Sequence, residues 1–474
     1  MNNFKYILLV FLIALASSCA DEFIDLAPES SANVDAFYNN QQDMEQAVIA
    51  AYAALQSRGQ YAQNFLYFME VRSDNSIVED ITKAAGEEGN LDLFREASTN
   101  SYLESTWNVC YTGIQRCNIV LARIDDIEMD AELRDIRKGE VQFIRALTYF
   151  NLVRIWGEVP VVTNELASVS DAYDHRRQPI EEVYAQIIAD LQAAVDKLPA
   201  TQTNIGRATK GAALALLGKV YLTRQDWAAA INTLNQVEGY SLLPNYADVF
   251  DVNNENNAES IFEVQFVGNS NGEGSLFLRL HTPLNNTTLL GGVGAGGVGD
   301  NLPSEDLLNA FENADLRKVV TVAALPDGRL HTNKYNGIPA NTNDEDNNFM
   351  VLRYADVLLM LAEALNEQGY MADGEAFMYL NQIRERAGLS ALDANDLPDQ
   401  QSFREAIYQE RRLELAFENH RWFDLIRTGT YAQVMKAYEE DRAPMVVEEF
   451  RRYFPVPQSQ IDISPGNIYQ NEGY

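Results

Sequence analysis

The chain has few cysteines and histidines for its length, and this shortage excludes two kinds of stabilising site. Of 474 residues only three are cysteine and four are histidine. Cys110 and Cys117 lie seven residues apart in what reads as one helix. The corresponding rise of about 10.5 Å is too long for a disulfide. We expect two buried thiols and, because the histidines show no ligand spacing, no zinc centre.

Positive charge is also scarce. The chain has 36 lysines and arginines against 69 aspartates and glutamates, which gives a formal net charge of −33. Such a chain repels polyanions, so nucleic acid is not an expected partner in the absence of a basic patch. The hydrophobic fraction of 46% is that of an ordinary globular protein, which excludes a largely disordered chain.

The N-terminus carries the features of a lipoprotein signal peptide. Lys5 precedes an apolar run over residues 7–16, which is about half the ~20 residues that a membrane span requires. Small residues then lead directly to Cys19, whose thiol is the expected site of lipidation. We expect residues 1–18 to be cleaved and residues 19–40 to form a polar tether. A single folded domain then occupies residues 41–474.

Helical periodicity dominates the chain from about residue 43. Residues 139–156 place a polar side chain at every third position, which predicts a helix buried on nearly all sides. The stretch that starts at Arg207 reads as two helices joined at Gln225 and Asp226, with small residues at the spacing of a tetratricopeptide repeat. A looser copy follows in residues 351–389.

The two copies predict an all-α-dominated repeat scaffold that is interrupted by long loop insertions. The main insertion, about residues 251–348, is rich in glycine, asparagine and aspartate and holds one strand-like run, SIFEVQFV. Loops of this length are uncommon without a functional purpose. We therefore expect the insertion to carry part of a binding surface.

Four segments carry a resemblance to a known family. They are IRALTYFNLVRIWGEVPVVT from Ile144, the tetratricopeptide-like stretch from Arg207, IYQERRLELAFENHRWFDLIRTG from Ile407 and FPVPQSQIDISPGNIYQNEGY from Phe454. In this order, behind Cys19, they resemble the SusD/RagB family of outer-membrane nutrient-binding lipoproteins. The resemblance implies a right-handed tetratricopeptide-like scaffold of four helix pairs, with the remaining chain packed against it.

The resemblance also implies a function. It indicates a binding protein and not an enzyme, which captures a glycan, or less often a peptide, and delivers it to a partner SusC-like TonB-dependent transporter. The acids Asp21 and Glu22 after Cys19 resemble the export signal of surface lipoproteins in Bacteroidetes, so we expect a lipid-anchored protein on the outer face of the outer membrane. A periplasmic tetratricopeptide scaffold for protein partners and a surface glycoside hydrolase remain as alternatives, although no carboxylate pair stands out.

In this family the ligand surface comes from the loop after the first helix and from the central insertion, here residues 73–102 and 268–348. A sugar needs an aromatic face together with amides, carboxylates or guanidinium groups. The candidates in this chain are Asp74, Arg95, Asn100, Tyr102, Phe277, Arg279, His281 and Tyr335. Neither stretch holds tryptophan, which keeps a peptide or another small ligand open.

Neither a catalytic residue nor a cofactor is expected from the sequence. The acidic loop NTNDEDNN from Asn341 leaves a structural calcium ion open as an alternative to a solvated loop.

Overall fold

The computed structural model describes residues 38–268, 272–439 and 447–474. The expected signal peptide, Cys19 and residues 19–37 of the tether lie outside these ranges. Within them the chain is dominated by helices, and its strands form short two-stranded pairs. This confirms the fold class predicted from the sequence. None of the described helices is both long and apolar enough to cross a bilayer.

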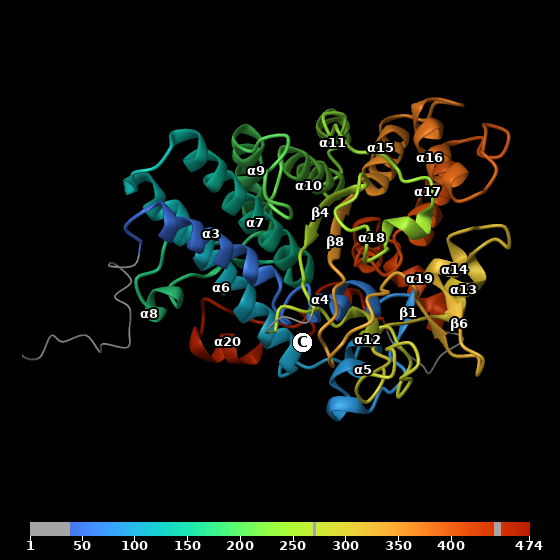
Figure 1. Ribbon diagram of the computed structural model, residues 1–474, viewed down its shortest axis with the longest axis horizontal. Coiled ribbons are helices and arrows are strands. Elements are labelled where there is room, and N and C mark those ends of the chain that lie inside the picture. Colours follow the sequence, from blue (N-terminus) through green and yellow to red (C-terminus); the bar gives the residue numbers. More distant parts are fainter. Residues whose placement is uncertain (1–37, 269–271, 440–446) are drawn as a thin grey trace, which may run out of the picture.

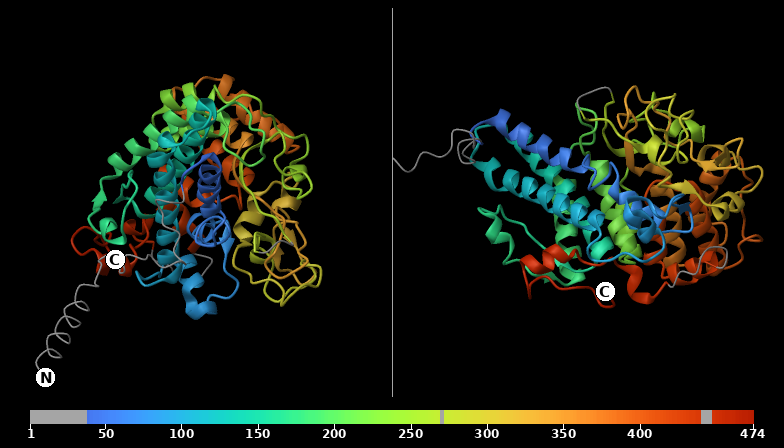
Figure 2. Two further views of the ribbon diagram at one scale, coloured as in Figure 1. Left: turned by 60° about the vertical axis from the view of Figure 1, so that its left-hand side comes forward. Right: turned by 90° about the horizontal axis from the view of Figure 1, so that it is seen from below.

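The main helices form a consecutive series in which each packs against a neighbour in the chain, and the series bends into an arc (Figures 1 and 2). This arrangement fits the expected helix-pair scaffold. The series consists of α3 (Gln41–Leu55), α6 (Ser101–Arg123), α7 (Ala131–Trp156), α9 (Ile180–Lys197), α10 (Lys210–Thr223), α11 (Trp227–Leu234), α15 (Tyr354–Gln368), α16 (Glu375–Arg386) and α17 (Gln400–Glu414).

Shorter elements complete the body around this arc. The helices are α4 (Asn64–Leu66), α5 (Glu87–Asp92), α8 (Val169–Ala172), α18 (Arg421–Arg427), α19 (Tyr431–Glu439) and α20 (Gln458–Ile463). A π-helical turn spans Tyr67–Val71, and 3-10 turns span Lys83–Gly86, Ile124–Asp126, Tyr246–Val249 and Glu449–Arg452. Strands β2 (Val159–Pro160) and β3 (Arg177–Gln178) pair antiparallel.

The predicted helix pair from Arg207 is present as α10 and α11. Asp226 caps α11 by accepting a hydrogen bond from the Ala229 amide at 3.1 Å, and Gln225 turns the chain with a φ of +60°. The two helices approach closely because Gly218 has no side chain. A Cβ atom at this position would lie 2.4 Å from a methyl carbon of Leu234. The small residue is therefore required by the packing.

The central insertion starts and ends at a strand pair. Strand β4 (Ser260–Val264), which was predicted from the run SIFEVQFV, pairs antiparallel with β8 (Phe349–Arg353). The described chain between them forms a lobe at one end of the molecule (Figure 2, right). It contains α12 (Phe277–Leu280), β5 (Leu302–Pro303), α13 (Glu305–Ala310), α14 (Lys318–Thr321), β6 (Ala323–Ala324) and β7 (Leu330–His331).

A buried ionic cluster joins this lobe to the C-terminal helices. The Arg353 guanidinium, at the end of β8, contacts Glu259 at 2.8 Å, Glu414 at 2.6 Å and Glu418 at 2.6 Å. Lys334, in the lobe, pairs with the same Glu418 at 2.6 Å. All five side chains are almost inaccessible to solvent. Charges at this depth are stable only when each has a partner, so the cluster fixes the position of the lobe.

Candidate functional site

The structure brings together the two regions that the sequence analysis selected as a ligand surface. Strand β1 (Ser76–Ile77), from the first region, pairs antiparallel with β5 from the insertion. Beside this pair, the Tyr67 hydroxyl donates to Asp300 at 2.7 Å, and Lys83 forms an ion pair with the same carboxylate. The two regions therefore form one continuous loop face.

Two candidates from the first region have structural partners. Asp74 is buried between Arg421, at 2.7 Å, and Arg412, at 2.9 Å. Burial alone would raise the pKa of this carboxyl, but the two guanidinium groups outweigh it and lower the pKa to about 2. Asn100 is the N-cap of α6, and its side chain also donates to the Glu87 carbonyl at 3.2 Å. Both side chains are buried and engaged by these partners, which indicates a structural role.

The aromatic candidates of the insertion lie in the core, which corrects the expectation that their rings face a ligand. Phe277 is 1% exposed and packs against Phe349 at 5.5 Å between ring centroids. The Tyr335 hydroxyl donates to the Phe417 carbonyl at 2.8 Å. His281 is stacked on Tyr335 at 4.6 Å, and burial lowers the pKa of its imidazole to about 4. These rings form part of the hydrophobic core, because burying their apolar surface is favourable.

Three predicted residues remain at least partly exposed on the loop face. Tyr102 is half-buried, and its hydroxyl donates to Glu88 at 2.6 Å. Arg279 is also half-buried and donates to the Asn343 side chain at 2.6 Å. Arg95 is exposed. These three side chains are the part of the predicted surface that a ligand can reach.

The structure offers no evidence for the calcium alternative. Among the residues that are described, no three histidine, cysteine, aspartate or glutamate side chains gather as metal ligands. Cys110 and Cys117 are both free and buried, as predicted. Burial raises the pKa of the Cys117 thiol to about 12, so this thiol stays protonated at neutral pH.

A groove of about 560 Å³ opens between α6, α8 and α20, away from the loop face. One wall holds Trp107 and Tyr111, whose ring centroids lie 5.2 Å apart. The lining also includes the side chain of Tyr173, which is 40% exposed, and the amide of Gln460. The amide of Gln115 lies in the groove as well, but its nitrogen and its oxygen both bond to the Leu166 backbone, at 3.1 and 3.2 Å. Aromatic rings together with amides are the groups that bind the apolar faces and the hydroxyls of a sugar.

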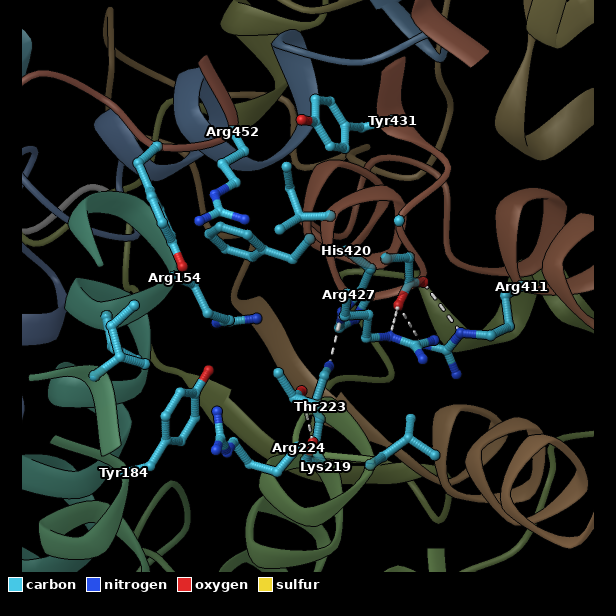
Figure 3. Close-up of a pocket in the computed structure, with 18 of the residues that line it drawn as sticks. Arg154, Tyr184, Lys219, Thr223, Arg224, Arg411, His420, Arg427, Tyr431 and Arg452 are labelled. Carbon is cyan, nitrogen blue, oxygen red and sulfur yellow. Dashed lines mark hydrogen bonds and ion pairs between the residues drawn. The ribbon is translucent and has the colours of Figure 1, made fainter. Parts of the chain in front are cut away.

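A second cavity, of about 570 Å³, lies between α7, α9, α10, α18 and α19 (Figure 3). Its lining is strongly basic. Six cationic side chains border it, with two carboxylates, Asp424 and Glu449. The cations are Arg154, Lys219, Arg224, Arg411, Arg427 and Arg452.

Four of the six cations are ion-paired. Lys219 contacts Asp356 at 2.9 Å, Arg411 contacts Asp424 at 3.0 Å, and Arg427 and Arg224 pair with Glu363 and Glu181. The Lys219 ammonium also lies 2.8 Å from Nδ1 of His420. Burial, and then the Lys219 charge, lower the pKa of His420 to about 3, so this imidazole is neutral at physiological pH.

Arg154 differs from these four because no carboxylate pairs with it. Its guanidinium lies between the rings of Phe150, 3.9 Å to the centroid, and Phe423, 4.0 Å. Two of its nitrogens donate to the Phe150 carbonyl at 3.0 Å and to Asn151 at 2.6 Å. Burial disfavours the charged form and lowers the pKa of Arg154, but the group remains cationic at neutral pH.

The groove and the basic cavity were missed by the sequence analysis. Their linings come from segments that are far apart in the chain, such as Arg154 on α7 and Arg452 near the C-terminus. The sequence around Arg411 and Arg427 gives no sign of the cavity, because both side chains pair with carboxylates of neighbouring helices.

The fold is that of a helix-dominated protein with long inserted loops, and the described residues form no cluster of metal ligands. Two family models match the sequence: "SusD family" over residues 326–474 and "Starch-binding associating with outer membrane" over residues 22–222. A SusD-like protein of Formosa agariphila is 30% identical over 97% of this chain and 96% of its own length. The chain belongs to the SusD family.

The descriptions of two further relatives name the ligand that they bind. A solved structure described as a laminarin binding SusD-like protein is 27% identical, with a TM-score of 0.79, and covers 92% of this chain and 100% of its own. The starch-binding protein SusD of Bacteroides thetaiotaomicron is 21% identical over 74% of this chain and 75% of its own length. The family predicted from the sequence is confirmed.

Proposed function

We propose that this protein is a non-enzymatic lipoprotein of the outer membrane that binds a glycan at the cell surface and passes it to a SusC-like TonB-dependent transporter. Lipidation at Cys19 provides the anchor, and residues 41–474 form the single binding domain. Similarity along nearly the full length to a laminarin-binding protein supports the glycan as ligand. The family description as starch-binding and outer-membrane-associated supports the location.

One observation carries the placement of the glycan. The groove beside α6 combines a ring exposed to solvent, Tyr173, with the amide of Gln460, which also donates to the Asn108 side chain at 3.1 Å. Tyr173 is one of two aromatic side chains among the described residues whose large apolar surface is exposed, and the other, Tyr469, lies one residue from the groove residue Ile468. Exposed aromatic surface is therefore concentrated at this end of the molecule, whereas on the loop face only Tyr102 remains accessible.

The test is glycan binding by the full chain and two single variants. An array of neutral and acidic oligosaccharides, including laminarin fragments, identifies the ligand, and calorimetry then compares Tyr173→Ala with Tyr102→Ala. Removing one stacking ring costs about 1 to 3 kcal/mol, or about 5- to 150-fold in affinity, by analogy with base stacking on aromatics. We expect this loss for Tyr173→Ala.

Tyr173→Phe is the matched control because it keeps the ring and removes only the hydroxyl. The Tyr173 carbonyl accepts hydrogen bonds from Ser464 and Asn467, and both side-chain variants leave these bonds in place. A loss in Tyr102→Ala alone would move the site to the loop face. Absence of any glycan ligand for the parent protein would contradict the function.

A further inference from the structure

We propose that the basic cavity of Figure 3 binds the acidic group, a carboxylate or a sulfate ester, of a charged saccharide. This goes beyond the proposed function, because the cavity is a second site that shares no lining residue with the groove beside α6; the saccharide part of the ligand rests on the proposed function. The cavity volume of about 570 Å³ lies within the range of about 300 to 1,000 Å³ that is typical of small-molecule sites.

The geometry of Arg154 provides the first argument. Both faces of its guanidinium are covered by Phe150 and Phe423, and two of its three nitrogens already donate to protein acceptors. The third nitrogen, Nη1, has no acceptor among the described residues. Figure 3 shows the end of this side chain directed into the space between Tyr184, Arg452 and Lys219. A guanidinium that is held by its faces and open at its edge is preorganised to donate to an oxyanion.

The charge balance provides the second argument. Asp356, Glu363, Glu181 and Asp424 neutralise Lys219, Arg427, Arg224 and Arg411, so these four cations and their partners add no net charge. Arg154 and Arg452 form no ion pair with a described residue, and Glu449 is the single carboxylate of the lining that remains to offset them. His420 contributes no charge because its pKa is lowered to about 3. The cavity therefore has an excess of positive charge at neutral pH.

The composition of the chain makes this excess informative. With 69 acids against 36 bases, an arginine has many possible carboxylate partners, yet Arg154 forms no ion pair with any described residue. Asp356 and Asp424, the acids that act on Arg154, are neutralised by Lys219 and Arg411, and exposed acids more than about 8 Å away are largely screened at physiological salt. A ligand carboxylate or sulfate supplies the missing partner for Arg154, and Arg452, which is exposed beside the cavity, adds a second contact.

The test compares charged and neutral sugars on the full chain. The probes are a galacturonate tetrasaccharide, a sulfated galactose tetrasaccharide and the uncharged galactose tetrasaccharide, measured by calorimetry. We expect the charged probes to bind more tightly than the uncharged one. The tighter of the two charged probes identifies carboxylate or sulfate ester as the source of the negative charge. Sodium sulfate should compete better than sodium chloride at equal ionic strength.

Three variants assign the effect to the cavity. Arg154→Met keeps an apolar stem between the two rings and removes the charge, and it should weaken binding of the charged probe by about 10- to 150-fold, the value of a charged hydrogen bond. Arg452→Gln should weaken it as well and, being a surface substitution, it keeps the test valid if Arg154→Met does not fold. Arg58→Gln removes an exposed arginine outside the cavity and should bind like the parent.

The outcomes separate this inference from the proposed function. Equal affinity for charged and neutral probes, or unchanged binding by Arg452→Gln and folded Arg154→Met, overturns the acidic-ligand inference and leaves glycan binding intact. If none of the three probes binds, the acidic-ligand inference fails, and the proposed function is decided separately by the oligosaccharide array.

Discussion

Replacing Arg353 by methionine should destabilise the protein strongly, because this arginine is shared by three buried carboxylates. Its loss leaves Glu414 with Arg317, at 3.0 Å, and Arg386 as partners. Glu418 is affected most. It loses two hydrogen bonds, of 2.6 and 3.0 Å, and keeps Lys334 as its buried cation. Removing one partner of a buried ion pair costs about 3 to 5 kcal/mol.

The size of the chain determines how this loss appears in a melting experiment. An unfolding entropy of about 2.1 cal/mol/K per residue amounts to about 0.9 kcal/mol/K for the folded part of this chain. A loss of about 3 to 5 kcal/mol therefore lowers Tm by about 3 to 6 °C in scanning calorimetry. Urea unfolding followed by circular dichroism provides an independent measure of the same free energy of unfolding.

Two further variants make the interpretation specific. Arg404→Met removes an arginine whose ion pair with Glu367 is more exposed, and it should cost less than about 1 kcal/mol. Adding Glu418→Gln to Arg353→Met removes the carboxylate left short of partners and should recover part of the loss. A Tm for Arg353→Met within 1 °C of the parent would refute the role assigned to the cluster.

Two further predictions concern the pH dependence of stability and the attachment to the membrane. Since the folded pKa of Asp74 is lowered to about 2 from an ordinary value of 3.8, its contribution of about 2 kcal/mol is present above pH 4 and is lost as pH falls from about 4 to about 2. Asp74→Asn should flatten the decline in stability over this interval, and an unchanged urea midpoint profile between pH 4 and pH 2 would contradict that. Cys19→Ala should abolish lipid labelling and release the protein from membranes, because one acylated cysteine is the expected anchor. Membrane retention equal to the parent in a fractionation experiment would show another attachment.

The helical scaffold could be predicted because its signals are local. Polar residues that rotate around the helix over residues 139–156 predicted burial on nearly all sides, and this part of α7 is indeed buried. The turn at Gln225 and Asp226 is determined by a cap and a left-handed residue within the same few positions. Such features depend on neighbours in sequence, which a single sequence contains.

The candidate site could be predicted only in part, because its geometry depends on distant contacts. Phe277 and Tyr335 have the composition of a sugar-binding loop, but whether a ring faces solvent or the core is decided by Phe349 and Phe417. Likewise, nothing near Arg154 in the sequence indicates that it lacks a carboxylate partner. That absence is a property of how α7 packs against α10 and α18.

Strands β4 and β8 join the chain at the two ends of the inserted lobe, and this has an evolutionary implication. A loop that is closed at its base tolerates changes in length, because each doubling of loop length costs only about 0.6 kcal/mol of closure entropy. Segments within the lobe can therefore be gained, lost or exchanged between relatives while the helical arc is inherited unchanged. New recognition surfaces can therefore arise in the lobe without a change in the helical arc.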